Sequence, residues 1–492
     1  MLLTMLVPTR DEYLQRTLGT QPMAVYRDML ADLETPLSAY WKLAHDQVYS
    51  FLLESVTGGE QVSRFSVLGI LPKAVLRSKN GNVRRITPSG TEEFKLTEGE
   101  DPLHVLSREL HEKKPLYVPG LPAFATGAVG MMSYDIVRYF ERLPDSTQDD
   151  LNVDDLAMMM VDTVVVFDHA KNLIRIVSMA DGTEADYDRA RADIEGIVAK
   201  LSGPLPPLPS SSGEPHPVEC NITQEQFEGM VSRMIEYITQ GDGIQMVPSQ
   251  RFSTKVDAHP VTVYRSLRSI NPSPYMFILR FGDFDLVGAS PELLVSLHGT
   301  RARVRPIAGT RWRGRDEAED AALADELIND VKERAEHIML VDLGRNDLGR
   351  VCEYGTVHVN DLMVIEKYSH VMHIVSDVTG TLREGLDAFD LFRACHPAGT
   401  VSGAPKVRAM QIIDELETTR RGSYAGAVGF VSHAGDLDTC IALRTIYLQD
   451  GVAYVQAGGG VVYDSIPVKE YEESRNKSKA SLRAIEVAQK GL

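Results

Sequence analysis

The chain has 492 residues, of which 43% are hydrophobic and 24% are charged, and its formal net charge at pH 7 is −18. This length suits two or three ordinary domains, and the composition is that of a folded globular protein, which excludes disorder over most of the chain. The acidic balance argues against nucleic acid and anionic membrane surfaces as partners, because both select basic patches. A pocket for an anionic ligand would therefore have to be locally basic.

The cysteines and the apolar runs indicate the cellular compartment in which the protein is expected. The four cysteines show no Cys-x-x-Cys spacing, which disfavours a disulfide framework or a structural zinc site. They are Cys220, Cys352, Cys395 and Cys440. Residues 1–8 lack the basic leader and the long apolar run of a signal peptide, and no stretch of about 18 apolar residues occurs. We expect a cytoplasmic protein that binds neither membranes nor nucleic acid.

One segment, residues 202–217, is rich in proline, serine and glycine. Proline fixes its own backbone and removes a hydrogen-bond donor, so such a segment is expected to be extended and poorly packed. It predicts a division of the chain into an N-terminal part, residues 1–201, and a C-terminal part, residues 218–492.

Hydrophobic periodicity predicts the elements of the C-terminal part. A helix is expected from Thr223, which can cap it, to Ile238. Strands are predicted at 275–281, 293–297, 372–378, 427–432, 439–448 and 452–456, and further helices at 321–341, from Ser402–Pro405 onward, and at 468–489. The last three strands are expected to form a meander whose second turn, Asp450-Gly451, favours positive φ. Hairpins alternating with helices favour an α+β fold with antiparallel sheets.

Two motifs of common enzymes are missing. No Gly-x-Gly-x-x-Gly follows a predicted strand, and Gly399–Lys406 resembles a phosphate loop without its Lys-Ser/Thr ending. No cysteine lies in a Gly-x-Cys-x-Gly turn, which excludes a glutaminase nucleophile of that kind. Nucleotide binding and glutamine hydrolysis are therefore not expected of this chain.

Two acidic pairs have helical spacing, Glu333 with Glu336 and Glu470 with Glu473. Carboxylate sites without histidine suit Mg²⁺. The alternative is that both pairs lie on solvated helix faces, because the predicted apolar stripe of helix 321–341 leaves Glu336 on the polar side and Glu473 could pair with Lys477 four residues later.

Other candidates also have two interpretations. Gly458–Gly460 can bring backbone amides close to a carboxylate or form a simple turn. Arg444, within an apolar run, needs an anionic partner, which is either a substrate carboxylate or an internal salt bridge. His373 is either a core residue of its strand or a functional one. Glu292, directly after a strand, can be held as a desolvated acid or can face water.

Together and in this order, these motifs resemble the chorismate-utilising enzymes. The resemblance is carried by Gln245–Gln250, Asn271–Met276, Gly288–Glu292, Arg305–Arg311, Glu336–Leu348, Gly399–Lys406 and Glu473–Lys477, with Leu52–Ser55 in the N-terminal part. It covers essentially the whole chain and implies two packed, largely antiparallel β-sheets flanked by helices. Two departures are Gly459, where alanine is commoner, and Gln250, where many relatives have arginine.

The resemblance also implies residue roles. Glu336 and Glu473 would bind Mg²⁺, which would hold a chorismate carboxylate. Glu292 would be the general acid that protonates the departing 4-hydroxyl group, and His373 would act near that hydroxyl or in the later loss of pyruvate. The remaining pocket residues are Gln245 and Thr400 in catalysis, and Gly309, Thr310, Tyr424, Arg444, Gly458, Gly459, Gly460 and Lys477 in substrate binding. Ser55, Pro274, Tyr275 and Met276 would bind L-tryptophan as an inhibitor.

Two positions bear on the product. Lysine at the Gln245 position is typical of relatives that add water, whereas a neutral glutamine suffices to orient ammonia. Lysine at the Ala308 position is typical of aminodeoxychorismate synthases. With alanine there, the chain instead resembles anthranilate synthase component I. That resemblance implies a separate glutamine amidotransferase subunit as the source of ammonia. The alternatives are aminodeoxychorismate synthase component I, an enzyme that stops at the aminodeoxyisochorismate intermediate, and a catalytically silent subunit that binds tryptophan.

Overall fold

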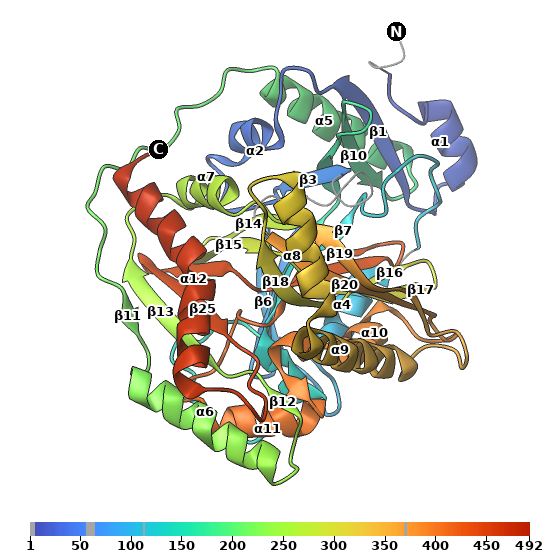
Figure 1. The fold of residues 1–492 in the computed structure, drawn as a ribbon. Helices are drawn as coiled ribbons and strands as arrows, with labels where there is room; N and C mark the ends of the chain where they lie inside the picture. The colour runs from blue at the N-terminus through green and yellow to red at the C-terminus, as the bar shows by residue number, and fades with distance from the viewer. Residues whose placement is uncertain (1–4, 56–63, 112–113, 369–370) are drawn as a thin grey trace.

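Two large sheets dominate the protein, which a computed structural model describes over residues 5–55, 64–111, 114–368 and 371–492 (Figure 1). The first has the order β1 (Met23–Leu30), β10 (Leu173–Ala180), β9 (Thr163–Asp168), β3 (Phe65–Ile70), β2 (Tyr49–Glu54), β14 (Tyr275–Phe281), β15 (Phe284–Ser290), β24 (Thr445–Gln449), β25 (Val452–Gly458), β13 (Ser249–Lys255) and β11 (Glu219–Cys220). The second has the order β18 (Ile307–Trp312), β20 (Val371–Thr381), β17 (Arg301–Val304), β16 (Leu293–His298), β23 (Leu437–Ile441), β22 (Ala427–Ser432), β7 (Gly127–Met132), β8 (Leu156–Val161), β4 (Ala74–Lys79), β5 (Asn82–Thr87) and β6 (Gly90–Lys95), and β19 (His358–Lys367) also pairs with β20. A short third sheet joins β12 (Gln245–Met246) to β21 (Gly403–Ala404).

The pairings between these strands are antiparallel. One hydrophobic cluster contains side chains of both large sheets, among them Phe51 and Val165 of the first and Met131 and Met159 of the second. The sheets therefore pack on each other, and the predicted α+β fold of two packed antiparallel sheets is confirmed.

Helices cover the remaining surfaces of the sheets. Those packed on the first sheet are α2 (Pro36–Ala44), α5 (Glu184–Leu201), α7 (Pro260–Ile270) and α12 (Pro467–Lys490), with α1 (Arg10–Thr17) on α5 and α6 (Gln224–Thr239) on α12. Those packed on or beside the second are α8 (Glu317–Asn329), α9 (Val331–Gly349), α10 (Ala388–Cys395) and α4 (Pro102–His111), with the short helices η2 (Tyr134–Tyr139) and η3 (Gly399–Val401). Helix α11 (Lys406–Leu416) packs beside the short sheet. Within the described ranges, no helix is both long and apolar enough to cross a membrane.

Each large sheet combines strands from both sides of residues 202–217. In the first sheet β2 pairs with β14, and in the second β7 pairs with β22. The segment 202–217 itself forms neither helix nor strand, as its prolines predict. Several contacts hold it on the protein; among them, Trp41 Nε1 donates to Pro206 O at 3.2 Å and Ser211 Oγ donates to Gln489 O at 2.8 Å. Residues before and after the segment therefore share both sheets.

Helix α6 shows how local sequence sets an element. Thr223 caps it, its hydroxyl accepting from Gln226 N–H while the Gln226 side chain accepts from Thr223 N–H. Phe227, Met230 and Met234 recur at helical spacing and are buried. The predicted helix and its cap are both confirmed.

The predicted helix 321–341 is wrong in one respect, because it is two helices. Asp330 ends α8 and caps α9, its side chain accepting from the N–H groups of Lys332 and Glu333. Because of this break, the side chains of α9 face other directions than those of a single continuous helix would. Val331 and Ile338, which belong to the predicted apolar stripe, are therefore 83% and 47% exposed. His337, Leu340 and Val341 face the core instead, and Glu336 is half-buried rather than solvated.

The predicted strand 439–448 is also wrong, and so is the meander built on it. The strand β23 ends at Ile441 in the second sheet, and β24 begins at Thr445 in the first. Residues 442–444 carry the chain between the sheets, and Arg444 has a φ of 49°. The hairpin between β24 and β25 is confirmed, with φ of 51° at Asp450 and 73° at Gly451.

Candidate active site

The glycine segment Gly458–Gly460 follows β25 and lies between two acidic helices. A Cβ atom on its middle residue would lie 3.3 Å from Glu473 Oε1 of α12, and one on its last residue would lie 3.6 Å from Glu336 Oε1 of α9. Gln245 of β12 donates from Nε2 to Glu336 Oε1 at 3.0 Å. The same Nε2 would be 2.2 Å from a Cβ on the last glycine, so any larger residue there would displace the Gln245 amide. The structure thus brings the predicted metal, glycine and Gln245 residues together.

Negative charge gathers around this segment. Burial raises the pKa of Glu336, and the carboxylates of Glu333 and Glu473 raise it further. Lys477 Nζ lies 2.7 Å from Glu473 Oε1 and donates to Gly458 O at 3.1 Å. The i,i+4 pair considered from the sequence is therefore present, but its lysine also reaches the glycine segment.

The two carboxylates fit a Mg²⁺ ion. This ion prefers hard oxygen ligands, keeps several waters and takes one or two protein carboxylates. No cluster of three or more His, Cys, Asp or Glu side chains arranged for a metal occurs in the described part of the chain. A Mg²⁺ held by Glu336 and Glu473 would therefore keep open positions for water and for an anionic ligand. A cation would also relieve the repulsion between these carboxylates.

Glu292 lies between β15 and β16, directly after Ser290 and Pro291, and it is only 6% exposed. Thr400 of η3 donates from Oγ1 to Glu292 Oε1 at 3.1 Å. Burial raises the pKa of Glu292 to about 8, although the Thr400 hydrogen bond opposes the shift. A cavity of about 40 Å³ lies beside both side chains. At neutral pH Glu292 is therefore a protonated acid rather than a solvated carboxylate.

His373 of β20 is held by the neighbouring strand β18. A register shift between Ala308 and Arg311 leaves Gly309 and Thr310 out of the pairing, and Gly309 has a φ of 66°. His373 Nδ1 lies 2.8 Å from Gly309 O and 3.1 Å from Thr310 Oγ1. Because a carbonyl oxygen only accepts, Nδ1 carries the proton. Burial lowers the pKa of His373, so the ring is neutral and Nε2 is an acceptor.

Arg444 lies where the chain crosses between the sheets, and its side chain is half-buried. Burial lowers its pKa. Among the residues that the structure describes, no acidic side chain pairs with it, which disfavours the internal salt bridge. Its charge is close enough to lower the pKa of His373, after burial as the larger cause. Tyr424 is buried, and its hydroxyl would lie 3.1 Å from a Cβ on Gly458. A cation and a phenol are thus available to an anion in this region.

Comparisons with known proteins agree with this geometry. The profile of the family described as chorismate binding enzyme matches residues 50–483. Anthranilate synthase component 1 of Pseudomonas aeruginosa is 46% identical over 98% of this chain and 99% of its own length. The protein of the same name in Thermus thermophilus is 46% identical over 95% of this chain and 98% of its own length. The chain belongs to the chorismate binding enzymes.

Solved structures of chorismate-utilising proteins share the fold. Anthranilate synthase component I from Streptococcus pneumoniae is 38% identical, with a TM-score of 0.78 over 92% of this chain and 99% of that one. The menaquinone-specific isochorismate synthase of Escherichia coli has a TM-score of 0.71 over 97% of this chain and 99% of that one. At 18% identity, this second likeness concerns the fold alone.

The residues expected to bind tryptophan lie at a second place in this chorismate binding enzyme. Ser55 follows β2, and Glu54 of that strand is opposite Met276 of β14, which brings Ser55 beside Tyr275 and Pro274. Ser55 Oγ is buried and has no hydrogen-bond partner among the described residues. The four predicted residues therefore come together from both parts of the chain.

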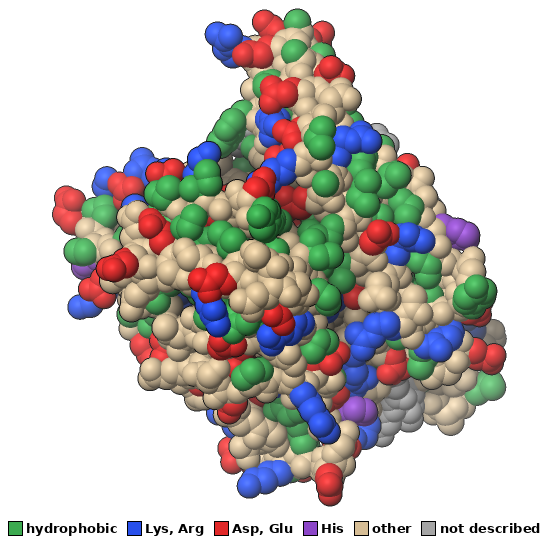
Figure 2. Space-filling view, turned by 60° about the horizontal axis from the view of Figure 1, so that its bottom comes forward, with side chains coloured by type: hydrophobic (Ala, Val, Ile, Leu, Met, Phe, Trp, Pro, Cys, Tyr) green, Lys and Arg blue, Asp and Glu red, His purple; other side chains and the backbone are tan. Residues whose placement is uncertain are grey.

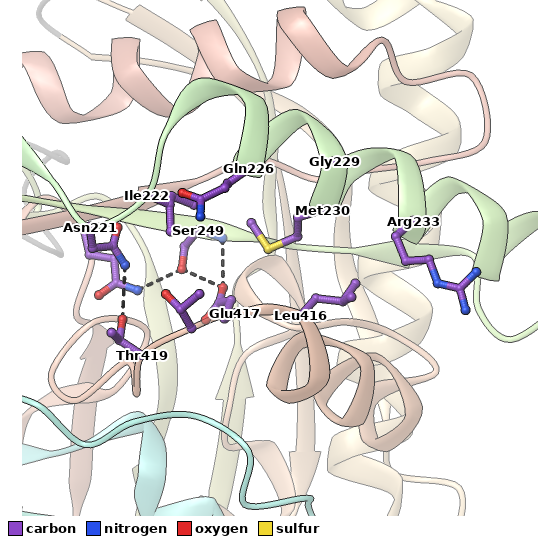
Figure 3. Close-up of a pocket in the computed structure, with 12 residues that line it drawn as sticks. Asn221, Ile222, Gln226, Gly229, Met230, Arg233, Ser249, Leu416, Glu417 and Thr419 are labelled. Carbon is purple, nitrogen blue, oxygen red and sulfur yellow. Dashed lines mark hydrogen bonds between the residues drawn. The ribbon is translucent and has the colours of Figure 1, made fainter.

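A larger cavity of about 270 Å³ lies behind the glycine segment, between α6 and residues 416–419 (Figure 3). None of the predicted site residues lines it. At its wall Ser249, which is opposite Gly458, donates from N and Oγ to Glu417 Oε1 at 2.9 and 2.8 Å. Arg421 pairs with Glu417 and donates to Val247 O at 2.6 Å. This hydrogen-bond network holds the start of β13, the strand that pairs with β25 next to the glycine segment.

Sequence reasoning missed the pair Glu417 and Arg421. Their i,i+4 spacing is that of an exposed helical pair, yet both are almost fully buried. Only tertiary contacts distinguish the two cases.

Proposed function

We propose that this chorismate binding enzyme is the large subunit of anthranilate synthase, which converts chorismate and ammonia to anthranilate and pyruvate in tryptophan biosynthesis. The observation that carries the proposal is Gln245. It is 2% exposed, its Nε2 is held by Glu336, and its Oε1 has no partner in the described residues. Neutral ammonia can donate to this oxygen and needs no base, whereas water would need one that an amide cannot provide.

The second support for this product is Ala308. It precedes the unpaired residues Gly309 and Thr310 and is opposite Ile374 of β20. A lysine amine at this position could attack the ring itself and lead to amination at carbon 4. A methyl group cannot, so ammonia adds at carbon 2. The relatives named anthranilate synthase component 1, at 46% identity, support the same choice.

The substrate is held by its carboxylates. Glu336 and Glu473 would bind Mg²⁺, which neutralises one substrate carboxylate when it is bound. Arg444, Tyr424 and the amides of Gly458–Gly460 would bind the other, together with Lys477. Gly309 and Thr310 would line the pocket. The support is that these donors lie around one glycine segment or beside His373.

Glu292 and Thr400 act in the first step. As the nitrogen of ammonia bonds to carbon 2, the ring double bonds shift and the carbon 4–oxygen bond breaks. Glu292 gives its proton to the departing hydroxyl group, which leaves as water, and the ammonium group formed at carbon 2 then loses one proton, so that Glu292 can be protonated again. The pKa of about 8 supports this role, because the acid is protonated at neutral pH. Thr400 orients the carboxyl group through its 3.1 Å hydrogen bond.

His373 acts in the second step. Loss of the proton on carbon 2 and breakage of the bond between carbon 3 and the ether oxygen release pyruvate and leave the aromatic product. The neutral ring with Nδ1–H on Gly309 O presents Nε2 as an acceptor, which supports proton removal rather than donation to the 4-hydroxyl.

A partner supplies ammonia, and tryptophan regulates the site. The relatives are named component 1, and the chain has no Gly-x-Cys-x-Gly turn, which supports a separate glutamine amidotransferase subunit. Ser55, Pro274, Tyr275 and Met276 would bind L-tryptophan, for which the unpartnered Ser55 hydroxyl is a support. Four free cysteines support a cytoplasmic enzyme.

The test is to incubate the purified chain with chorismate, Mg²⁺ and an ammonium salt and to identify the products by fluorescence and mass. Anthranilate and pyruvate in equal amounts are expected. Formation of 4-amino-4-deoxychorismate would favour the aminodeoxychorismate alternative, and accumulation of the 2-amino intermediate would mean that pyruvate is not eliminated. A chain that binds tryptophan but leaves chorismate unchanged would be a silent regulatory subunit.

A further inference from the structure

The guanidinium of Arg311 binds three carboxylates from three consecutive places in the chain. Nε donates to Glu326 Oε1 of α8 at 2.9 Å. Nη2 donates to Asp330 Oδ2, between α8 and α9, at 3.1 Å. Nη1 donates to Glu333 Oε1, in the first turn of α9, at 3.3 Å. The side chain is 22% exposed, so these contacts are partly shielded from solvent.

Two of these contacts fix the start of α9. The free oxygen of Asp330 caps the helix by accepting from the N–H groups of Lys332 and Glu333 at 2.9 and 3.1 Å. The free oxygen of Glu333 lies 3.0 Å from the place that a Cβ on Gly309 would take. Glu336 follows Glu333 by almost one turn and lies on the same face. The orientation of this first turn therefore decides where the Glu336 carboxylate points.

Arg311 is equally fixed to the unpaired residues of β18 that hold His373. It directly follows Thr310, and its Nη1 donates to Thr310 O at 3.1 Å. Thr310 Oγ1 and Gly309 O are the two groups that contact His373 Nδ1. The Arg311 side chain thus joins the part of β18 that contacts His373 to α9, the helix that carries Glu336.

We propose that Arg311 is a positioning residue that couples helix α9, which carries Glu336, to Gly309 and Thr310 of β18. The inference rests on the proposed function, because it takes Glu336 and Glu473 as the Mg²⁺ ligands. Arg311 touches no reacting atom. It neutralises Glu333, the like charge nearest Glu336 on α9, and holds the capped first turn against Gly309. Lysine cannot replace it, because a single ammonium group cannot span carboxylates on α8, on the junction and on α9.

The chain offers a matched control in Arg313, two residues further along. Its guanidinium makes a bidentate pair with Asp320 of α8 at 2.7 and 3.0 Å and donates to Tyr368 O at 2.7 Å. Arg313→Lys thus removes an arginine fork that binds α8 but is not bonded to α9. A second variant, Asp330→Asn, keeps an N-cap residue and loses the ion pair with Arg311, together with the negative charge at the N-terminus of α9.

Two measurements test the coupling on the full chain. Calorimetric titration with Mg²⁺ alone gives its dissociation constant, and hydrogen exchange without Mg²⁺ reports on the amides of residues 331–336. Arg311→Lys should weaken Mg²⁺ binding by about tenfold, which corresponds to the loss of about one charge-assisted hydrogen bond. It should also speed exchange at 331–336. Asp330→Asn should change both in the same direction, and Arg313→Lys should change neither.

Unchanged affinity and unchanged exchange in Arg311→Lys would overturn the proposal, and so would equal losses in Arg313→Lys. Should Arg311→Lys fail to fold, Asp330→Asn decides by the same two readouts. A failure of the metal assignment looks different, because Mg²⁺ would then bind Glu336→Gln as tightly as the unaltered chain. In that case the coupling to the metal is overturned even if exchange at 331–336 speeds up.

Discussion

At the scale of single residues, burial makes one carboxyl group unlike the others of this acidic protein. Glu292 is enclosed by the strand ends around it, and its only side-chain donor is the Thr400 hydroxyl among the contacts described. Desolvation disfavours the carboxylate and raises the pKa to about 8. An acid with this pKa is protonated at the pH at which the reaction has to run, and it still donates readily.

This pKa predicts the pH profile. The proposed mechanism needs protonated Glu292, so kcat/KM for chorismate should be constant well below pH 8 and should fall as the pH rises through about 8. The measurement needs the concentration of neutral ammonia held constant at each pH. Glu292→Gln should lower the rate by about 10²–10⁴-fold and remove this limb. A profile that stays level through pH 9 would contradict the role of Glu292.

The proposed metal ligands give a second prediction. Glu336→Gln and Glu473→Gln should each abolish Mg²⁺-dependent turnover at limiting Mg²⁺ while leaving the fold intact, because an amide oxygen is a poor substitute for a carboxylate toward a hard cation. Glu472→Gln is the control, since Glu472 is exposed on the same turn of α12. Activity and unfolding temperature should be measured together. If either variant kept near-normal activity, its glutamate would belong to a solvated face.

At the scale of elements, the sequence predicts what local pattern controls. The strands at 275–281 and 427–432 have the predicted bounds, because β-branched and aromatic residues run between clear turn residues. The breaks at Asp330 and at residues 442–444 were not predicted. An aspartate in a helical run looks like any polar position until it caps the next helix, and a chain that crosses between sheets keeps its apolar pattern throughout.

The candidate site divides in the same way. Motifs identify Gln245, Glu292, Glu336 and Glu473 as candidates, but the raised pKa values of Glu292 and Glu336 follow from burial, which only the packed sheets reveal. The role of Arg311 depends on three contacts spread over two helices, and no spacing rule connects them.

Strand pairing leads to a prediction about inhibition. Tyr275 of β14 is opposite Ser290 of β15, whose hydroxyl donates to Ile441 O at 2.6 Å, and Ile441 N donates to Glu292 O at 3.0 Å. A ligand bound between Ser55 and Tyr275 would thus act on strands that are hydrogen-bonded to the backbone around Glu292. This is a physical route for coupling the two sites.

Ser55→Phe should therefore relieve inhibition by tryptophan, because the ring would fill the space at the unpartnered hydroxyl. The uninhibited rate should change little. Inhibition curves with tryptophan, for this variant and for Ser55→Ala as the smaller change, are the measurement. If Ser55→Phe remained as sensitive as the unaltered chain, the regulatory site would lie elsewhere.

At the scale of the whole molecule, an anionic substrate meets a chain with a net charge of −18. The face in Figure 2 carries acidic and basic side chains interspersed with apolar ones. We expect attraction to come from within the proposed site, where Arg444 lacks an acidic partner among the residues described. A Mg²⁺ ion held by Glu336 and Glu473, as proposed, would add further positive charge.

The source of ammonia gives the last prediction. The purified chain should form anthranilate from chorismate with an ammonium salt, and faster at pH values that increase the neutral form, up to the point at which Glu292 loses its proton. It should not use glutamine, because the sequence has no Gly-x-Cys-x-Gly turn to hydrolyse it. Adding a glutamine amidotransferase subunit should restore glutamine-dependent synthesis. Anthranilate formed from glutamine by this chain alone would instead reveal a second active site with a different nucleophile.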